Sequence, residues 1–332
     1  MGSKVNPVRM GMIGMGNWAR EALVPAIKDL PMAEVIAVAA RSEASRATAL
    51  EHFPKTTTYA AAHDLIADDR VEAVIIAAPS ALHAQCIEDA LKANKHVFLE
   101  PPVGMSGGEV HHALELAERS DRVFHADYEL RYAPVVAAMQ RALQEGAIGK
   151  LLMAQVELSS NWGQGGDVGY AAEEGFFSWA GSWYLDLLDA CIGRECTSAE
   201  VLGGHANNGD LMDHGWALLE YPDGILGQFA FNIVSPHDLR IGVRLAGMEG
   251  EMQADLLTGR LRQRRVGDES VTGAIHQAAQ PVCGFVGVRE SVRAFLSAVG
   301  GGTSTQTGVE VCRRVYQTVE MCHRAAGRRR EG

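Results

Sequence analysis

Residues Val8-Arg9-Met10-Gly11-Met12-Ile13-Gly14-Met15-Gly16-Asn17-Trp18-Ala19 set the architecture of the first part of this chain. An apolar strand pattern runs into a glycine turn, and a helical pattern follows. Within the turn, Gly14-x-Gly16-x-x-Ala19 fits the G-x-G-x-x-G/A dinucleotide fingerprint, whose glycines allow a tight turn and let backbone amides approach a pyrophosphate. We therefore expect a nucleotide to bind at Gly14, Gly16, Asn17 and Trp18.

Strand and helix patterns alternate from this turn to about residue 127. Near-continuous apolar runs at 34–40, 71–78 and 96–99 are typical of strands that are buried on both faces of a sheet. Helical patterns separate them, which is the order of a doubly wound parallel sheet. The sequence thus predicts an α/β Rossmann domain over residues 1–127.

The second half of the chain has a different pattern. Strand-like segments surround Pro222-Asp223-Gly224, a strong hairpin turn, and helical patterns occur near 183–192, 289–299 and 308–326. These features predict an α+β domain over residues 128–332 with an open, mostly antiparallel sheet. They leave open whether the closing helices pack on this domain or back on the first one.

Composition excludes several classes of partner. The 332 residues are 47% hydrophobic and 21% charged, and their net charge of −11 disfavours nucleic acid or an anionic membrane as the main partner. No apolar run has the length of a membrane span, the first residues do not resemble a secretion signal, and none of the six cysteines forms a C-x-x-C pair. We expect a cytoplasmic protein with reduced cysteines and no metal site.

The residues that follow the second predicted strand bear on the choice of cofactor. An acidic residue at this point would normally bind the ribose 2′-hydroxyl of NAD. Here the strand ends in Ala40-Arg41-Ser42, and Arg41 and Ser42 can hold a 2′-phosphate by charge and by hydroxyl. The expected cofactor is therefore NADP (NADPH). In the alternative interpretation, Ser42 only caps the helix that starts near Glu43 and Arg41 is solvated.

Several motifs together point to a family. Ala78-Pro79-Ser80-Ala81-Leu82-His83, the segment Ala90-Leu91-Lys92-Ala93-Asn94-Lys95-His96-Val97-Phe98-Leu99-Glu100-Pro101-Pro102, Arg131-Tyr132-x-Pro134 and Glu145-Gly146-Ala147-Ile148-Gly149-Lys150 occur in this order. With them, the chain resembles the glucose-fructose oxidoreductase / inositol dehydrogenase / MocA (Gfo/Idh/MocA) family.

The resemblance implies NAD(P)-dependent hydride transfer at a carbinol or carbonyl of a sugar-like molecule. It also implies a C-terminal sheet that is often used for oligomerisation, here in a homodimer or homotetramer. By the same resemblance, Pro79, Ser80, His83 and Glu100 are assigned to the cofactor site.

Two departures from the family pattern concern catalysis. The family motif E-K-P carries a lysine thought to orient or protonate the substrate oxygen, but here Pro101 occupies that position and supplies no donor. The family motif D-x-G-x-H-x-x-D falls on residues 182–189, where Ser182 replaces the aspartate, Asp186 replaces the histidine and Asp189 keeps the last carboxylate. No lysine follows Lys150 that could take over the role.

The remaining candidates for proton transfer are Tyr128 and Asp186, and we predict these as catalytic. Tyr128 is alternatively an amphipathic residue between domains, and Asp186 a helix-surface charge. The predicted substrate-binding residues are Glu100, Trp162, Trp183 and Asp189. The aromatic members of this set are alternatively core residues.

Three functions are consistent with these residues. A site that loses a lysine and gains a carboxylate favours a cationic substrate, so the first is an NADP-dependent reductase of a small polar or ring-bearing compound such as an imine or amino-sugar-like carbonyl. The second is a sugar or polyol dehydrogenase with an acid–base group other than lysine. The third is an inactive NADP-binding sensor or assembly protein.

Overall fold

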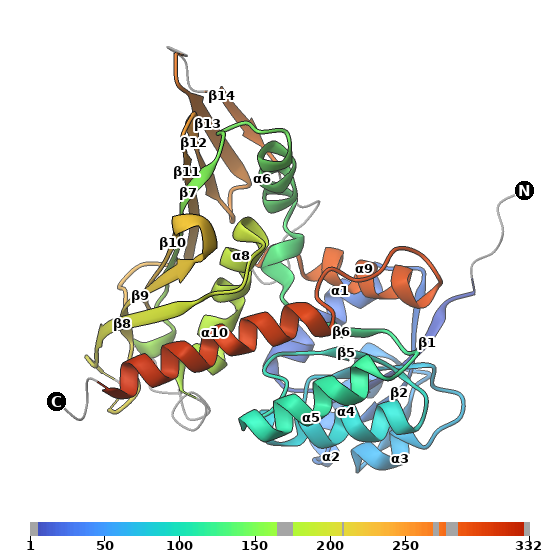
Figure 1. Cartoon of the computed structure of the whole chain (residues 1–332). Helices are drawn as coiled ribbons and strands as arrows, with labels where there is room; N and C mark the ends of the chain where they lie inside the picture. The colour runs from blue at the N-terminus through green and yellow to red at the C-terminus, as the bar shows by residue number, and fades with distance from the viewer. Residues whose placement is uncertain (1–5, 165–174, 208, 268–271, 277–284, 329–332) are drawn as a thin grey trace, which may run out of the picture. The chain divides into compact units, whose positions relative to one another are not determined.

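The computed structural model describes residues 6–164, 175–207, 209–267, 272–276 and 285–328. These residues form two compact units, which are described separately (Figure 1). The first unit lies within Met1–Tyr128 and Val288–Arg313, and the second within Glu129–Gly287 and Arg314–Gly332. No described helix is long and apolar enough to cross a membrane.

The first unit contains a six-stranded parallel sheet in the order β3-β2-β1-β4-β5-β6. The strand order reverses direction between β1 and β4, which is the switch point of a doubly wound fold. The central strands are apolar because helices cover both faces, and every residue of β4 is buried. The strands are β1 (Val8–Ile13), β2 (Ala33–Ala39), β3 (Thr57–Tyr59), β4 (Ala73–Ile76), β5 (His96–Leu99) and β6 (Phe124–Ala126).

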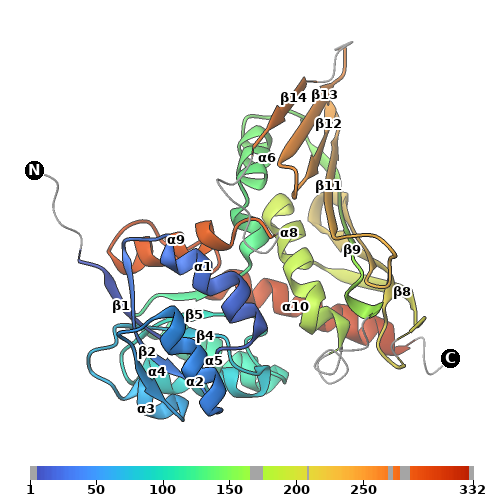
Figure 2. The same cartoon turned by 180° about the vertical axis from the view of Figure 1, so that it is seen from behind.

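The helices of this unit pack in two layers. α4 and α5 lie side by side on one face of the sheet, and α1 and α9 lie together on the other (Figures 1 and 2). A π-helical turn, Ala19–Leu23, leads directly into α1. The helices are α1 (Val24–Lys28), α2 (Glu43–His52), α3 (Ala62–Ile66), α4 (His83–Lys92), α5 (Gly107–Glu118), α9 (Val288–Val299) and the first turn of α10 (Val309–Arg328).

The second unit contains an eight-stranded sheet in the order β14-β13-β12-β11-β7-β10-β9-β8. β7 and β10 pair in parallel, and the other neighbours are antiparallel. The strands are β7 (Leu151–Ser159), β8 (Ser198–Gly204), β9 (His214–Tyr221), β10 (Ile225–Asn232), β11 (Arg240–Gly247), β12 (Gly250–Asp255), β13 (Arg260–Arg265) and β14 (Thr272–Ile275).

Helices cover one face of this sheet. α8 (Ser182–Ile192) packs on β7 and β10, and α6 (Pro134–Gln144) packs on β12 and β13. In β9 buried and exposed residues alternate strictly, as expected for a sheet with one covered face. The other face displays apolar side chains from four neighbouring strands, namely Met153, Leu202, Trp216, Leu218 and Leu226.

The predicted fold class is confirmed, but three strands were not predicted from sequence. β3, β13 and β14 are edge or near-edge strands, so they need no continuous apolar run. β13 has the sequence Arg-Leu-Arg-Gln-Arg-Arg, of which only Leu261 is buried. The five described cysteines are buried free thiols, and Cys283 lies outside the described residues.

The glycine turn after β1 depends on a close backbone approach. Gly14 has φ +103°, a conformation that L residues rarely adopt, and a Cβ at this position would lie 2.1 Å from the carbonyl oxygen of Ala77. The Gly14 amide donates a hydrogen bond to the Ala39 carbonyl at 2.9 Å, which ties the turn to the end of β2. A Cβ at Gly16 would meet no atom within 4 Å.

Gly14→Ala and Gly16→Ala should therefore differ in stability. Gly14→Ala combines backbone strain with a backbone clash, and we expect it to lower the free energy of unfolding by more than about 2 kcal/mol. Gly16→Ala should change that free energy by less than about 1 kcal/mol. Urea titration of the purified variants measures both changes, and equal losses would contradict the described turn.

Candidate functional site

In the first unit, the predicted site residues follow the carboxyl ends of parallel strands. Gly14 follows β1, Arg41 follows β2, Pro79 follows β4 and Glu100 follows β5. Ligands of open α/β sheets bind outside this edge, near the switch point. The structure thus brings the predicted cofactor residues to one edge of one sheet.

The glycine turn has the shape that a pyrophosphate requires. Gly16 is exposed, and the space around its missing Cβ is open. The side chain of Asn17 accepts a hydrogen bond from Arg20, whose Nε also contacts the Gly16 carbonyl at 3.4 Å. Trp18 is half-buried beside the turn. These residues fit a dinucleotide phosphate, because backbone rather than side chain faces the open space.

The segment after β2 has the helix cap of one sequence interpretation and the exposed Arg41 and Ser42 that the other interpretation requires. Ser42 caps α2, because its Oγ accepts a hydrogen bond from the Ser45 amide at 3.1 Å. Arg41 and Ser42 are nevertheless exposed. A second guanidinium, missed from sequence, belongs to Arg46, whose Nη1 donates to the carbonyls of Ala40 and Arg41 at 2.8 Å each. Its position one turn into α2 could have been found from helical spacing alone.

His83 connects two loops at this edge. Its Nδ1 lies 2.7 Å from the Pro102 carbonyl oxygen, and its Nε2 lies 2.8 Å from that of Ala78. Burial lowers the pKa of His83, while the two carbonyl contacts oppose that change. The ring therefore holds the exposed Pro79 and half-buried Ser80 on one side and the Pro101-Pro102 segment, joined by a cis peptide bond, on the other.

Two carboxyl groups meet where β5 and β6 end. A hydrogen bond joins the side chains of Glu100 and Asp127, and Ser291 of α9 donates its hydroxyl hydrogen to Oδ1 of Asp127. Burial raises the pKa of Asp127 to about 7, although both hydrogen bonds act to lower it. Tyr128, the next residue, is buried, with 4% of its surface exposed. Sequence reasoning missed Asp127, although it directly follows a predicted strand.

The lysine nearest to this segment in sequence has a structural role. Lys95 is buried at the amino end of β5, and its Nζ donates to the carbonyl oxygens of Asp68 and Val71 at 3.0 and 2.7 Å. It lies at the end of the strand opposite to Glu100. Lys95 therefore holds the loop that precedes β4.

In the second unit, Asp186 and Asp189 belong to a buried cluster of charges. Arg131 binds the Asp186 carboxylate through Nε at 3.1 Å and Nη2 at 2.6 Å, and Nη2 also contacts Asp189 at 2.8 Å. Arg314 binds Asp189 at 2.7 and 3.0 Å. Burial raises the pKa of Asp186 to about 6, and Arg131 opposes that rise. Two guanidinium groups thus balance two carboxylates.

The predicted aromatic residues lie in two different surroundings. Trp162 is half-buried and contacts Trp179 edge-on at 6.4 Å between ring centroids and Phe285 in a stacked arrangement at 6.1 Å. Trp183 is half-buried on α8. The neighbouring Phe176 stacks on Phe231 of β10 at 4.0 Å and belongs to the core.

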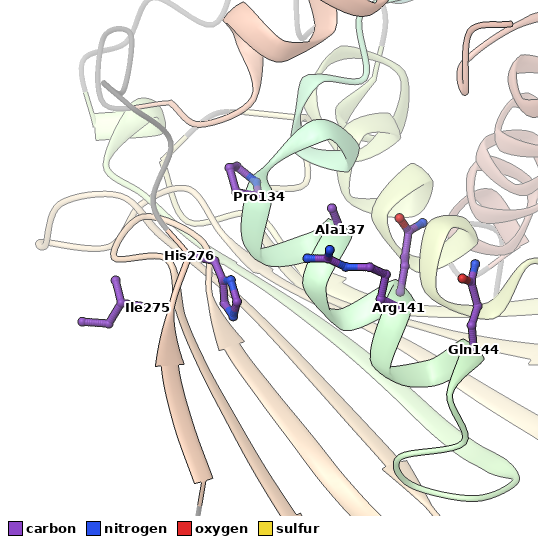
Figure 3. A pocket seen from close by; sticks show the side chains of 7 residues that line it. Pro134, Ala137, Arg141, Gln144, Ile275 and His276 are labelled. Carbon is purple, nitrogen blue, oxygen red and sulfur yellow. The ribbon is translucent and has the colours of Figure 1, made fainter. Parts of the chain in front are cut away.

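A hollow of about 580 Å³ lies between α6 and β14 (Figure 3). The side chains of Arg141 and His276 face each other across it, whereas Ile275 points away (Figure 3). The described residues that line this hollow include no predicted site residue. They are Pro134, Ala137, Gln140, Arg141, Gln144, Ile275 and His276.

Two family models match the two parts of the chain. Residues 8–128 match an oxidoreductase family with an NAD-binding Rossmann fold, and residues 136–253 match the GFO/IDH/MocA C-terminal domain. The chain belongs to the Gfo/Idh/MocA family of oxidoreductases. The resemblance inferred from the sequence motifs is thereby confirmed.

Named relatives act on sugar-like compounds. The dTDP-3,4-didehydro-2,6-dideoxy-alpha-D-glucose 3-reductase of Streptomyces violaceoruber is 29% identical over 76% of this chain and 73% of its own length. Inositol 2-dehydrogenase of Rubrobacter xylanophilus is 26% identical over 77% of this chain and 74% of its own length.

Solved structures share the fold over nearly the whole chain. A 3-ketoreductase from Actinomadura kijaniata, in complex with NADP and TDP-benzene, has a TM-score of 0.83 at 22% identity and covers 96% of this chain and 98% of its own. Levoglucosan dehydrogenase, in complex with NADH and levoglucosan, has a TM-score of 0.86 at 17% identity and covers 97% and 98%.

Asp186 is one of the two residues that the sequence predicts as catalytic. Its full burial and its ion pair with Arg131 make it a structural element of the second unit. Removing one partner of a buried ion pair leaves the other charge uncompensated.

Asp186→Asn should lower the free energy of unfolding by about 3 kcal/mol, measured by urea titration. The matched control is Asp223→Asn, which breaks an exposed pair with Arg194 and should cost less than about 1 kcal/mol. A similar small effect for both variants would show that the buried cluster does not stabilise the fold.

Proposed function

We propose that this Gfo/Idh/MocA oxidoreductase prefers NADP and transfers hydride between its nicotinamide and a carbonyl or alcohol carbon of a small, sugar-like ring. The observation that carries the cofactor preference is the end of β2, where Arg41, Ser42 and Arg46 gather and the three residues after the strand, Ala40-Arg41-Ser42, include no carboxylate. When bound, the nicotinamide supplies the hydride. Gly14, Gly16, Asn17 and Trp18 would hold the pyrophosphate, and Arg41 with Ser42 the 2′-phosphate.

The substrate class rests on relatives and on charge. The reductase and dehydrogenases named above act on sugar-like rings. An imine substrate would be favoured by excess negative charge at the site, but Asp186 and Asp189 are paired with Arg131 and Arg314. We therefore favour a neutral keto or hydroxyl group over an imine.

Roles for the other predicted residues follow from their surroundings. Pro79, Ser80 and Glu100 line the edge where the dinucleotide would lie, and we propose His83 as the residue that positions their loops. Tyr128 in the first unit remains a candidate for contact with substrate, and so, in the second unit, do Trp162, Trp183 and Asp189. Asp186 is better suited to positioning Arg131 than to proton transfer, because its carboxylate already accepts the guanidinium and is fully buried.

We further propose that a second copy of the chain covers the open face of the second sheet. Monomers rarely expose contiguous apolar surface of this kind, and Trp216, Leu218 and Leu226 are each 48% exposed on neighbouring strands. A homodimer or homotetramer would bury these side chains.

The expected activity is oxidation of NADPH by a panel of cyclic keto sugars, or reduction of NADP by the corresponding polyols. Arg41→Ala should weaken NADPH binding by about 10-fold or more, because it removes a charged hydrogen-bond donor, and should leave NADH binding nearly unchanged. Fluorescence titration of both cofactors measures this difference. An equal loss for NADPH and NADH would contradict the 2′-phosphate assignment. Absence of turnover with bound cofactor would favour the sensor or assembly alternative.

Trp216→Glu should lower the molar mass measured by light scattering, because a charge at the centre of the apolar face opposes association. Val266→Glu, at a 77% exposed position after β13, is the matched control and should leave the mass unchanged. A wild-type monomer at micromolar concentration would contradict the proposed face.

A further inference from the structure

The paired carboxyl groups of the first unit come from adjacent parallel strands. Leu99 of β5 is in register with Ala126 of β6, so Glu100 and Asp127 are the next residues on each strand. The Asp127 amide donates to the Leu99 carbonyl at 2.7 Å, which fixes both residues at the same level. Both carboxyl groups are buried, and burial disfavours the charged form of a carboxyl group, so we expect the pair to retain a proton.

A chain of hydrogen bonds with defined donors and acceptors runs from Asp127 through Ser291 and His125 to Thr305. Because Ser291 donates its hydrogen to Asp127, the Nε2–H of His125 must donate to the Ser291 Oγ, at 2.9 Å. The Nδ1 of His125 is then the acceptor for the Thr305 hydroxyl, at 2.5 Å. Burial lowers the pKa of His125 to about 3, and the ring stacks on Phe98 at 5.0 Å. A neutral histidine in one tautomer thus orients Ser291.

Side chains at the end of β5, on β6 and on α9 act on Asp127. Glu100 contacts it from the end of β5, and His125 acts on it through Ser291 from β6. From α9, the contact is the uncharged hydroxyl of Ser291. Asp127 is completely buried, whereas Glu100 keeps 7% of its surface exposed. Glu100 is therefore the less completely buried member of the pair, and we assign it the contact with a ligand.

The position of the pair fits the far half of a bound dinucleotide. With the 2′-phosphate at the end of β2 and the pyrophosphate at the turn after β1, the other nucleotide must extend across the switch point, over β4 and β5. Glu100 follows β5 and directly precedes Pro101, the position of the family lysine. A proton donor next to the vacant lysine position would lie where the substrate oxygen is expected.

We propose that Glu100 and Asp127 share one proton and form the acid–base group of this enzyme in place of the missing lysine. This inference rests on the proposed hydride transfer. Glu100 gives the shared proton to the substrate oxygen as the carbonyl carbon accepts hydride from the reduced nicotinamide. A C–H and an O–H bond form, the C=O double bond becomes single, and the nicotinamide is oxidised. The pair regains its proton from water after the alcohol leaves. Asp127, Ser291 and His125 are positioning residues.

The test compares Glu100→Gln and Asp127→Asn with the exposed control Asp121→Asn. In the reductive direction, Glu100→Gln should lower kcat by about 100-fold or more, because it removes the proton donor. Asp127→Asn should move the alkaline limb of the pH–rate profile by more than one pH unit toward acid, since its amide donates to the Glu100 carboxylate and releases the proton earlier. Asp121→Asn should match the wild type in both measurements.

A second readout needs neither cofactor nor substrate. The folded protein holds a proton at Asp127 that the unfolded chain releases near pH 4, so its free energy of unfolding should fall, relative to Asp127→Asn, as the pH rises from about 4 to 7. A kcat for Glu100→Gln within threefold of wild type, or an unmoved pH limb in Asp127→Asn, would overturn the catalytic role. If the wild type shows no turnover, the proposed function fails, and a stability difference that is flat with pH would then overturn the shared proton as well.

Discussion

The parallel register of the Rossmann sheet is the constraint on which the rest of this site depends. Because parallel strands all end at one edge, the residues that follow β1, β2, β4, β5 and β6 lie along that edge, on both sides of the switch point between β1 and β4. This row of residues begins with guanidinium groups after β2, continues through an open glycine turn after β1, and ends at two carboxyl groups after β5 and β6. Along the direction in which a dinucleotide extends, positively charged side chains are therefore followed by an uncharged turn and then by a protonated carboxyl pair. Gly14 makes this arrangement possible, since any side chain there would collide with the Ala77 carbonyl.

The buried carboxyl groups of the two units are stabilised by different interactions. In the second unit, Asp186 and Asp189 are compensated by Arg131 and Arg314, which makes the cluster a stabilising element without a free proton. In the first unit, Glu100 and Asp127 compensate each other through a shared hydrogen, which needs no cation and keeps a proton near neutral pH. Pairs of titratable groups in such surroundings are typical of acid–base sites. In place of the family lysine, the end of the same strand carries a carboxyl group that can transfer a proton.

Sequence reasoning predicted the fold class and the strand ends well, because apolar runs, glycine turns and helix patterns are local signals. It missed β3, β13 and β14, which are short or polar and lack a continuous apolar run, so their pairing depends on tertiary context. It also identified Asp186 by its place in a motif but not Arg131 as its partner, since the two are 55 residues apart. Asp127 was missed for the same reason: a lone aspartate after a short strand has no signal until its neighbour on β5 and the Ser291 hydroxyl on α9 are known.

The central claim is that a proton is shared between Glu100 and Asp127, and carboxyl-carbon NMR of the cofactor-free protein tests it most directly. The two carboxyl carbons should titrate together in two separated steps, one of them near pH 7, because interacting acids have pKa values that belong to the pair. Independent titration of both carboxyl groups near pH 4, the range of ordinary acidic side chains, would contradict it.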